Sequence, residues 1–250
     1  MEAQTTLVTG LMVAAFAAIH ISIGRLNFLS HSPRSHWLSF AGGAAVAYVF
    51  LHILPELAAH RTVFARALNM AEADAETVIY GVAMLGLALF YGLERLVTGA
   101  RIRPLRHGHG GATGLDVEWV HIGSFALYNV LIGYLLTHRE DPSPGALLLF
   151  FAAMSFHFVT TDHGLREDHA GPYDRYGRWV LVAAVVTGWL LGLAITVPPI
   201  AVALLFAFLA GGVILNVLKE ELPEERQSRF ASFAGGAVFY SALVIGEKLV

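Results

Sequence analysis

Eight long apolar stretches constrain the fold more than any other feature of this sequence. A membrane-spanning helix needs about 20 mostly apolar residues. The chain has 250 residues, of which 56% are hydrophobic and 14% charged, and its mean hydropathy is +0.62. The sequence therefore predicts an all-α membrane protein that forms a single polytopic domain over residues 1–250. The eight predicted transmembrane helices are Thr6–Gly24, Trp37–Leu57, Thr77–Val97, Asp116–Leu136, Gly145–His163, Trp179–Val197, Pro199–Leu218 and Phe230–Ile245.

The composition also excludes several functional classes. The net charge of −3 gives no basic surface for nucleic acid, and the apolar excess excludes a soluble or disordered chain. Because there is no cysteine, disulfides, thiolate metal sites and cysteine nucleophiles are excluded. Histidine is the anomaly, with 12 copies in a composition that otherwise suits contact with the lipid bilayer.

The positions of Lys and Arg predict the orientation in the membrane. Twelve of them lie in the loops that join helices one to two, three to four, five to six and seven to eight, and four lie elsewhere. The side rich in Lys and Arg faces the cytoplasm. We therefore expect a multi-pass protein of the cell membrane with both termini on the non-cytoplasmic side. The loop over residues 99–115 would be cytoplasmic, and its His107 and His109, set among glycines, are candidates for metal capture.

The two halves of the sequence share an ordered set of motifs. Because the second and seventh helices would run in opposite directions, as would the third and eighth, the order predicts an inverted repeat. Helices one to three would correspond to helices six to eight around a central pair, a 3+2+3 arrangement that favours a transporter. A competing pairing comes from Ser-Phe-Ala-Gly-Gly-Ala, which occurs at both 39–44 and 232–237. The paired motifs are Ala41-Gly42-Gly43 with Ala210-Gly211-Gly212, Leu54-Pro55-Glu56 with Leu222-Pro223-Glu224, Phe90-Tyr91 with Phe239-Tyr240, and Glu94-Arg95 with Glu247-Lys248.

Polar and ionisable side chains occur inside the fourth and fifth predicted helices. Such groups are costly at bilayer depth and by default mark function. Imidazole, carboxylate and carboxamide ligands without cysteine suit zinc, iron or manganese. We therefore predict a divalent metal site between these two helices. Its candidate ligands are Glu118, His121, Asn129, His157, Asp162 and His163.

His20, His52 and Glu56 form a second candidate group, either a secondary metal site or a gate. Ordinary structural roles compete with this hypothesis, since His52 can be an interfacial residue and His20 can bond a backbone carbonyl. Asp162 lies about 140° around a straight helix from His157, so the two do not both point at one ion without a bend. A metal, a histidine or Arg166, one turn further on, can each be the partner of Asp162.

These features resemble the Zrt/Irt-like (ZIP) family of metal transporters. The similar features are eight helices with both termini outside, His52-x-x-Pro55-Glu56, Glu94-Arg95, the histidine-bearing loop and the segment Leu218–Glu224. The resemblance implies that a divalent metal ion (zinc, iron or manganese) passes as the substrate through the fourth and fifth helices, and that the protein is not an enzyme. This chain departs from the family's helix-four motif, of which only His121 or Asn129 remains. The family's helix-five motif keeps its first and last positions as His157 and Asp162.

Two alternatives remain open from the sequence. One is a non-transporting ZIP-like sensor or scaffold with a degenerate metal site. The other is an intramembrane zinc hydrolase that uses His121, His157, His163 and Asp162 around a metal-bound water. Small-residue faces such as Gly42-Gly43 and Gly235-Gly236 can pack within one chain or between two copies, so a homodimer is also compatible with the sequence.

Overall fold

The computed structural model describes residues 2–25, 36–102, 114–139, 143–168, 170–221 and 229–249. All regular elements in these ranges are helical. The long helices are α1 (Glu2–Ser22), α2 (His36–Tyr48), α5 (Glu72–Ile102), α6 (Gly114–Leu135), α7 (Pro144–Asp168), α9 (Arg178–Ala194), α10 (Pro199–Glu221) and α11 (Phe230–Leu249). The short elements are a 3-10 turn η1 (Ile23–Arg25), two π-helical turns η3 (Val49–Ile53) and η5 (Tyr173–Gly177), and the helices α3 (Leu54–Ala59), α4 (Arg61–Leu68) and α8 (Ala170–Pro172).

By length and composition, six helical segments of the described chain can cross a membrane. Two shorter apolar helices, Ile122–Leu135 and Phe230–Gly246, lie within α6 and α11. The prediction of an all-α, multi-pass membrane protein is therefore confirmed in this coarse form. The two ends of the predicted loop at 99–115 are helical, because α5 continues to Ile102 and α6 begins at Gly114, and residues 103–113 lie outside the described residues. The six segments are Gln4–Arg25, His36–Leu68, Glu72–Leu93, Pro144–Glu167, Ala170–Ala194 and Pro199–Lys219.

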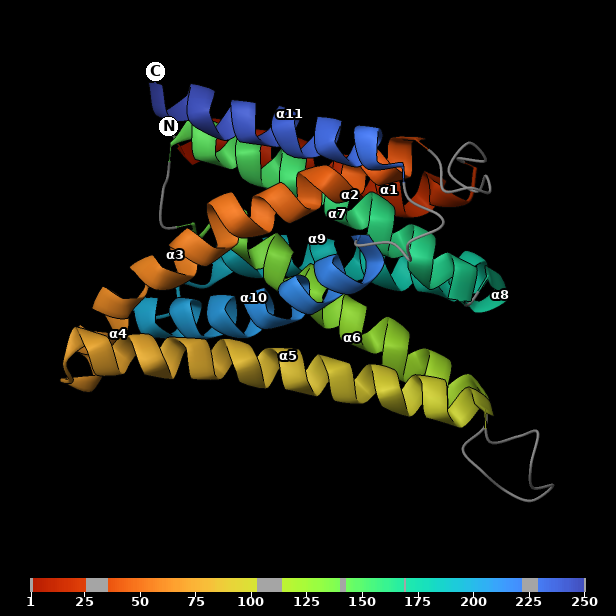
Figure 1. The fold of residues 1–250 in the computed structure, drawn as a ribbon, viewed down its shortest axis with the longest axis horizontal. Coiled ribbons are helices and arrows are strands. Elements are labelled where there is room, and N and C mark those ends of the chain that lie inside the picture. The colour runs from red at the N-terminus through yellow and green to blue at the C-terminus, as the bar shows by residue number, and fades with distance from the viewer. Residues whose placement is uncertain are drawn as a thin grey trace.

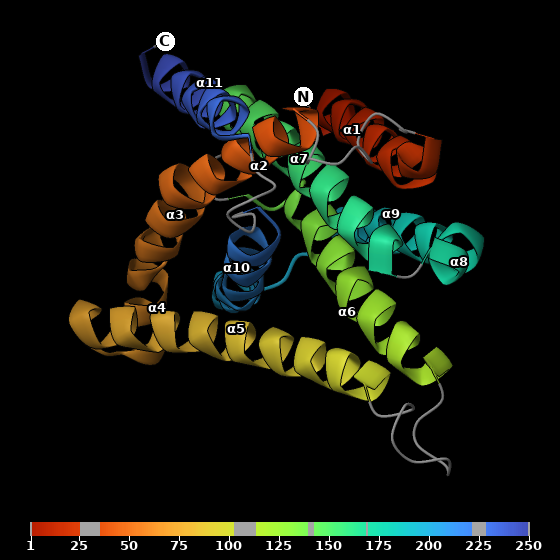
Figure 2. The same ribbon diagram turned by 45° about the vertical axis from the view of Figure 1, so that its right-hand side comes forward.

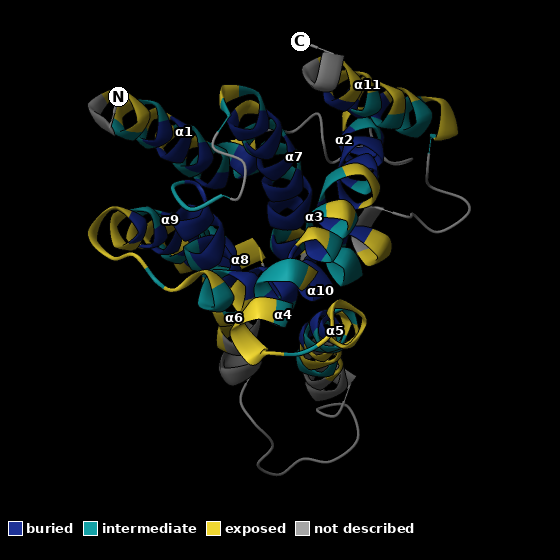
Figure 3. Ribbon diagram, turned by 90° about the vertical axis from the view of Figure 1, so that its left-hand side faces the viewer, coloured by how far each residue is buried: buried dark blue, intermediate teal, exposed yellow. Residues whose placement is uncertain are grey.

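The helices form two packed groups. In one group α2 packs on α11 and α5 packs on α10; in the other, α6 packs on α9, and α1 packs on α7 and α9. The groups meet mainly where α2 contacts α7 and where α5 contacts α6. Figure 1 shows α1 beginning and α11 ending at the same end of the molecule, and Figure 2 shows α5 and α11 at the outside of their group. Buried residues concentrate along α2 and α7, which are the central helices (Figure 3).

Glycines allow the paired helices to touch backbone to backbone. A Cβ added at Gly43 of α2 would overlap the carbonyl oxygen of Phe233 in α11. In the same crossing, a Cβ added at Gly236 would overlap the carbonyl oxygen of Phe40. Small residues at such crossings are how helices associate in lipid, where there is no hydrophobic driving force between them. Ser-Phe-Ala-Gly-Gly-Ala occurs twice in the sequence, and its two copies form the two sides of this one crossing.

The other two strong helix pairs repeat this arrangement. In each pair, the glycine of one helix contacts a backbone carbonyl oxygen of the partner helix. The residue that carries this carbonyl lies three positions before the glycine of the partner helix. Close backbone approach therefore fixes three crossings by the same device, and none of these glycines tolerates a side chain without movement of a helix. The crossings are Ala83 and Gly86 of α5 with Phe208 and Gly211 of α10, and Val130 and Gly133 of α6 with Val185 and Gly188 of α9.

The helix that begins as α2 changes its geometry before Pro55. Proline lacks an N–H, and its ring clashes with the carbonyl four residues earlier in an α-helix. The chain widens into the π turn η3, in which the N–H of Leu54 donates to the carbonyl of Val49. Such turns are frequent at functional sites, and this one carries His52.

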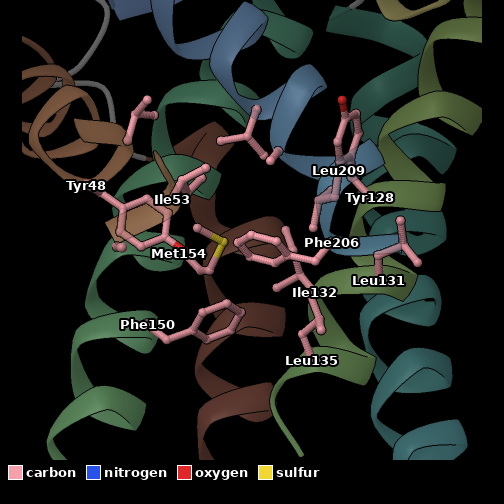
Figure 4. Packing of buried hydrophobic residues seen from close by; sticks show 14 of the residues in the cluster. Tyr48, Ile53, Tyr128, Leu131, Ile132, Leu135, Phe150, Met154, Phe206 and Leu209 are labelled. Atoms are coloured by element: carbon pink, nitrogen blue, oxygen red, sulfur yellow. The ribbon is translucent and has the colours of Figure 1, made fainter. Parts of the chain in front are cut away.

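Between the two groups, apolar side chains from α2, η3, α6, α7 and α10 meet in one cluster (Figure 4). Met154 of α7 lies between Ile53 of η3 and Phe206 of α10. Ile132 of α6 lies on the far side of Phe206 from Met154 (Figure 4). This cluster holds the two groups together, whereas His20, His157 and Asp162, described below, are not among its members.

Candidate functional site

A histidine, an aspartate and a tyrosine from three elements form one buried hydrogen-bonded group. His20 lies in the last turn of α1 and Asp162 lies on α7, and 2.6 Å separates the His20 Nδ1 from the Asp162 Oδ2. Tyr173, the first residue of η5, donates its hydroxyl to the same Oδ2 at 2.8 Å. His20 is 0% exposed and Asp162 1%. We call these three residues the His20–Asp162–Tyr173 group.

Tyr173 also secures the end of α1. Its hydroxyl lies 3.1 Å from the backbone carbonyl oxygen of His20. The last four carbonyls of a helix have no partner within the helix, and His20 is among those residues of α1. The hydroxyl proton is therefore shared between a carboxylate and a helix-end carbonyl. This sharing links α1, α7 and η5 at one point.

The geometry defines the state of the His20 ring. A carboxylate oxygen accepts, so Nδ1 carries a proton, and in the neutral ring the lone pair lies on Nε2. That Nε2 is buried and has no hydrogen-bond partner in the described part of the chain. An ionisable carboxylate at bilayer depth needs partners, and His20 and Tyr173 are the partners of Asp162. One imidazole nitrogen is thus left available to a ligand.

A second buried imidazole lies close to this group. The ring of Phe158 lies against both histidines, with centroid distances of 4.6 Å to His20 and 6.2 Å to His157. The Nδ1 of His157 lies 3.5 Å from the hydroxyl oxygen of Thr161. Two imidazoles on different helices therefore share one largely apolar environment.

Arg166 does not take the role of partner to Asp162. Its Nε and Nη2 donate to the two carboxylate oxygens of Asp174 at 2.9 and 3.0 Å. Because Asp174 follows Tyr173, the π turn η5 holds α7 at two neighbouring places. A Cβ added at Gly24 would lie 3.0 Å from the Arg166 Nε, so the chain just after α1 passes directly over this ion pair.

The remaining predicted ligands are spread more widely. His163 is buried, and its Nδ1 lies 3.7 Å from the Oε2 of Glu167. The Nδ2 of Asn129 donates to the carbonyl of Phe125 at 2.9 Å, and its buried Oδ1 has no partner in the described chain. His52 pairs with Glu56 in the other helix group. The structure thus joins His20 to the residues of α7 and separates it from His52 and Glu56.

Part of the predicted site lies outside the described residues. This applies to the loop residues His107 and His109 and to the side chains of Glu118 and His121. Among the side chains that the structure does describe, no three His, Asp or Glu residues are grouped closely enough to hold a metal ion. The described candidate residues therefore do not make up a complete metal site, and their possible nitrogen donors are His20, His157 and His163.

Sequence reasoning missed Tyr173 and the Arg166–Asp174 pair. Tyr173 stands among charged residues at the start of a predicted helix, where tyrosine is common as an interfacial anchor. The one available signal was the need of Asp162 for a donor, and that need does not say which helix supplies it.

Neither the protein-family models nor the curated proteins with which the chain was compared match it. The ZIP resemblance therefore rests on the motifs of this sequence.

Proposed function

We propose that this protein transports a divalent metal cation (zinc, iron or manganese) across the cell membrane, and that the ion meets His20 and His157 on its way. The observation that carries the proposal is the hydrogen bond from His20 Nδ1 to Asp162, together with the buried, unpartnered Nε2. Histidines that bind metals almost always donate their other ring N–H to a carboxylate, a backbone carbonyl or water. In this proposal His20 is a ligand, and Asp162 orients it.

The helix crossings support the repeat that such a transporter would use. The positions that meet between α2 and α11 have counterparts in α10 and α5, so that Phe40 corresponds to Phe208 and Gly43 to Gly211. This register differs by one residue from the pairing of Ala41-Gly42-Gly43 with Ala210-Gly211-Gly212. The offset that relates these positions also relates Pro55 to Pro223. We therefore pair the second predicted helix with the seventh and the third with the eighth, in an eight-helix, 3+2+3 inverted repeat.

The division into two helix groups supports alternating access. The His20–Asp162–Tyr173 group and His157 belong to one group, that of α1, α6, α7 and α9. Transporters with repeats open to either side largely by moving one bundle against the other around a fixed site. A site that lies within one group keeps its ligands together during such a movement.

The proposal is tested by reconstituting the purified protein into liposomes that contain a fluorescent metal reporter. We expect uptake of zinc, iron or manganese, and its loss in His20→Ala and in His157→Ala. His138→Ala is the matched control, because His138 stacks on Tyr134 away from this site. Uptake that is unchanged in both site variants would refute the assignment of these two histidines.

A second candidate function is a non-transporting membrane sensor or scaffold. It is favoured by the incomplete ligand set, because the described side chains contain no group of three ligands, and by the Asp162 Oδ2, which already accepts two hydrogen bonds. Under this alternative the purified protein would contain no metal and the liposomes would take up none. The metal content after purification separates the two candidates before any transport is measured.

A further inference from the structure

A second polar cluster lies in the other helix group, formed by Tyr48, His52, Glu56 and Tyr240. The Nε2 of His52 lies 3.4 Å from the Oε2 of Glu56. The His52 ring stacks on Tyr48 at a centroid distance of 5.3 Å, and the Tyr48 ring meets Tyr240 of α11 edge to face at 5.9 Å. The four side chains therefore form a continuous series of contacts. It begins at the partly exposed Glu56 of α3 and ends at the buried Tyr240 of α11.

Tyr240 carries the one feature of this cluster that packing does not explain. Its side chain is 0% exposed, and its hydroxyl has no hydrogen-bond partner in the described chain. A buried hydroxyl without a partner bears the full penalty of leaving water, whereas phenylalanine would fill the same space without it. Through Tyr48, whose ring meets both Tyr240 and His52, this buried hydroxyl belongs to the same cluster as the His52–Glu56 pair.

The cluster is accessible from one side. His52 and Glu56 are 23% and 21% exposed, whereas Tyr48 and Tyr240 are buried. The i, i+4 spacing places His52 and Glu56 on neighbouring turns, and the π turn before Pro55 sets the orientation of His52. In Figure 1, α3 and α8 lie toward opposite ends of the long axis. Glu56, which is on α3, and Tyr173, which directly follows α8, therefore lie toward opposite ends of the molecule.

We propose that His52, Glu56 and Tyr240 form a second binding site for a divalent metal cation. An imidazole nitrogen and a carboxylate suit zinc, iron or manganese, and a tyrosine oxygen can ligate iron. The inference rests on the proposed function for the identity of the ion. The site lies toward the end where α1 begins and α11 ends, so in the proposed topology it receives the ion before His157 and His20 do.

The test is a titration of the purified full-length protein in detergent with Co²⁺ alone, followed by calorimetry and by visible absorption. We expect two classes of site. His52→Gln and Tyr240→Phe should each weaken one class by about tenfold or more and leave the other unchanged, and His20→Gln should weaken only the other class. Tyr128→Phe is the matched control, because Tyr128 is also buried with an unpartnered hydroxyl but lies on α6.

A second measurement distinguishes a lost ligand from a damaged fold. In metal-free protein, Tyr240→Phe should not lower the temperature of unfolding, because the hydroxyl that it removes is unpaired. The same variant should lose most of the rise in unfolding temperature that Co²⁺ gives through this site. If His52→Gln and Tyr240→Phe both bind Co²⁺ as the unaltered protein does, the second site is overturned, even where His20→Gln loses the other class of site. If those two variants lose one class of Co²⁺ site and His20→Gln has no effect, the second site stands and the proposed role of His20 is overturned.

Discussion

His20 and Asp162 are 142 positions apart in the sequence, yet they share a buried hydrogen bond of 2.6 Å between Nδ1 and Oδ2. The bond joins the end of α1 to α7 where neither side chain meets water. Removing one member of such a pair leaves the other buried without its partner, which is much more damaging than losing both. The effects of substitutions at this pair should therefore exceed those at any exposed ion pair of the protein.

Asp162→Asn should weaken metal binding by about 10- to 100-fold. Asparagine keeps the shape of the side chain and an oxygen for His20 Nδ1, but it removes the negative charge next to the ring. Asp174→Asn is the control, since the Arg166–Asp174 pair is 33% and 41% exposed and exposed pairs contribute only about 0–1 kcal/mol. The measurement is a competition titration with a fluorescent zinc chelator. Equal losses in the two variants would contradict the role given to Asp162.

Tyr173→Phe should lower the free energy of unfolding by about 1–2 kcal/mol. The variant keeps the buried ring but removes the hydroxyl that donates to Asp162 and caps the His20 carbonyl. Tyr176→Phe, in the same π turn but exposed, should change it by less than about 0.5 kcal/mol. Unfolding in mixed micelles of increasing SDS content, followed by circular dichroism, gives both values. A loss at Tyr176 as large as that at Tyr173 would contradict the role given to the Tyr173 hydroxyl.

The sequence predicted the helices well, because the length of an apolar stretch is a local property. Apolar length did not predict the π turn before Pro55, which arises from the missing N–H of proline. The sequence leaves a metal, a histidine or Arg166 as candidate partners of Asp162, and in the structure the partner is His20. Angular position on α7 separated Asp162 from His157. It did not identify α1 as the facing helix, because pairing between helices depends on crossings that are distant in sequence.

The repeated hexapeptide is a second feature whose meaning the sequence alone does not determine. As a sequence signal, Ser-Phe-Ala-Gly-Gly-Ala competed with the pairing of the second and seventh helices. In the structure its two copies touch each other across one crossing, which offers an explanation of their similarity other than a repeat. Similar motifs in a membrane protein can therefore reflect either a repeat or a contact, and only the positions of the helices distinguish them.

Gly43→Ala should destabilise the protein by about 1–3 kcal/mol. The added Cβ would overlap the backbone carbonyl of Phe233, so α2 and α11 must move apart. Gly235→Ala is a close control, because nothing lies within 4 Å of its added Cβ, and alanine is better than glycine inside a helix by about 0.5–1 kcal/mol. Opposite signs in SDS unfolding are the expected result, and destabilisation by both variants would argue against the crossing.

The topology can be tested without altering a native thiol, because the chain contains no cysteine. Single cysteines at Val250 and at Ala112 should react differently with a membrane-impermeant maleimide in intact cells. The positive-inside rule places the Arg-rich side in the cytoplasm, so the cysteine at 250 should be labelled at once and the one at 112 only after permeabilisation. Labelling of both positions in permeabilised cells is the control for reactivity. Protection of position 250 in intact cells would reverse the orientation. It would also place the His52–Glu56–Tyr240 site at the exit of the pathway, since that site lies toward the end of the molecule where α11 ends (Figure 1).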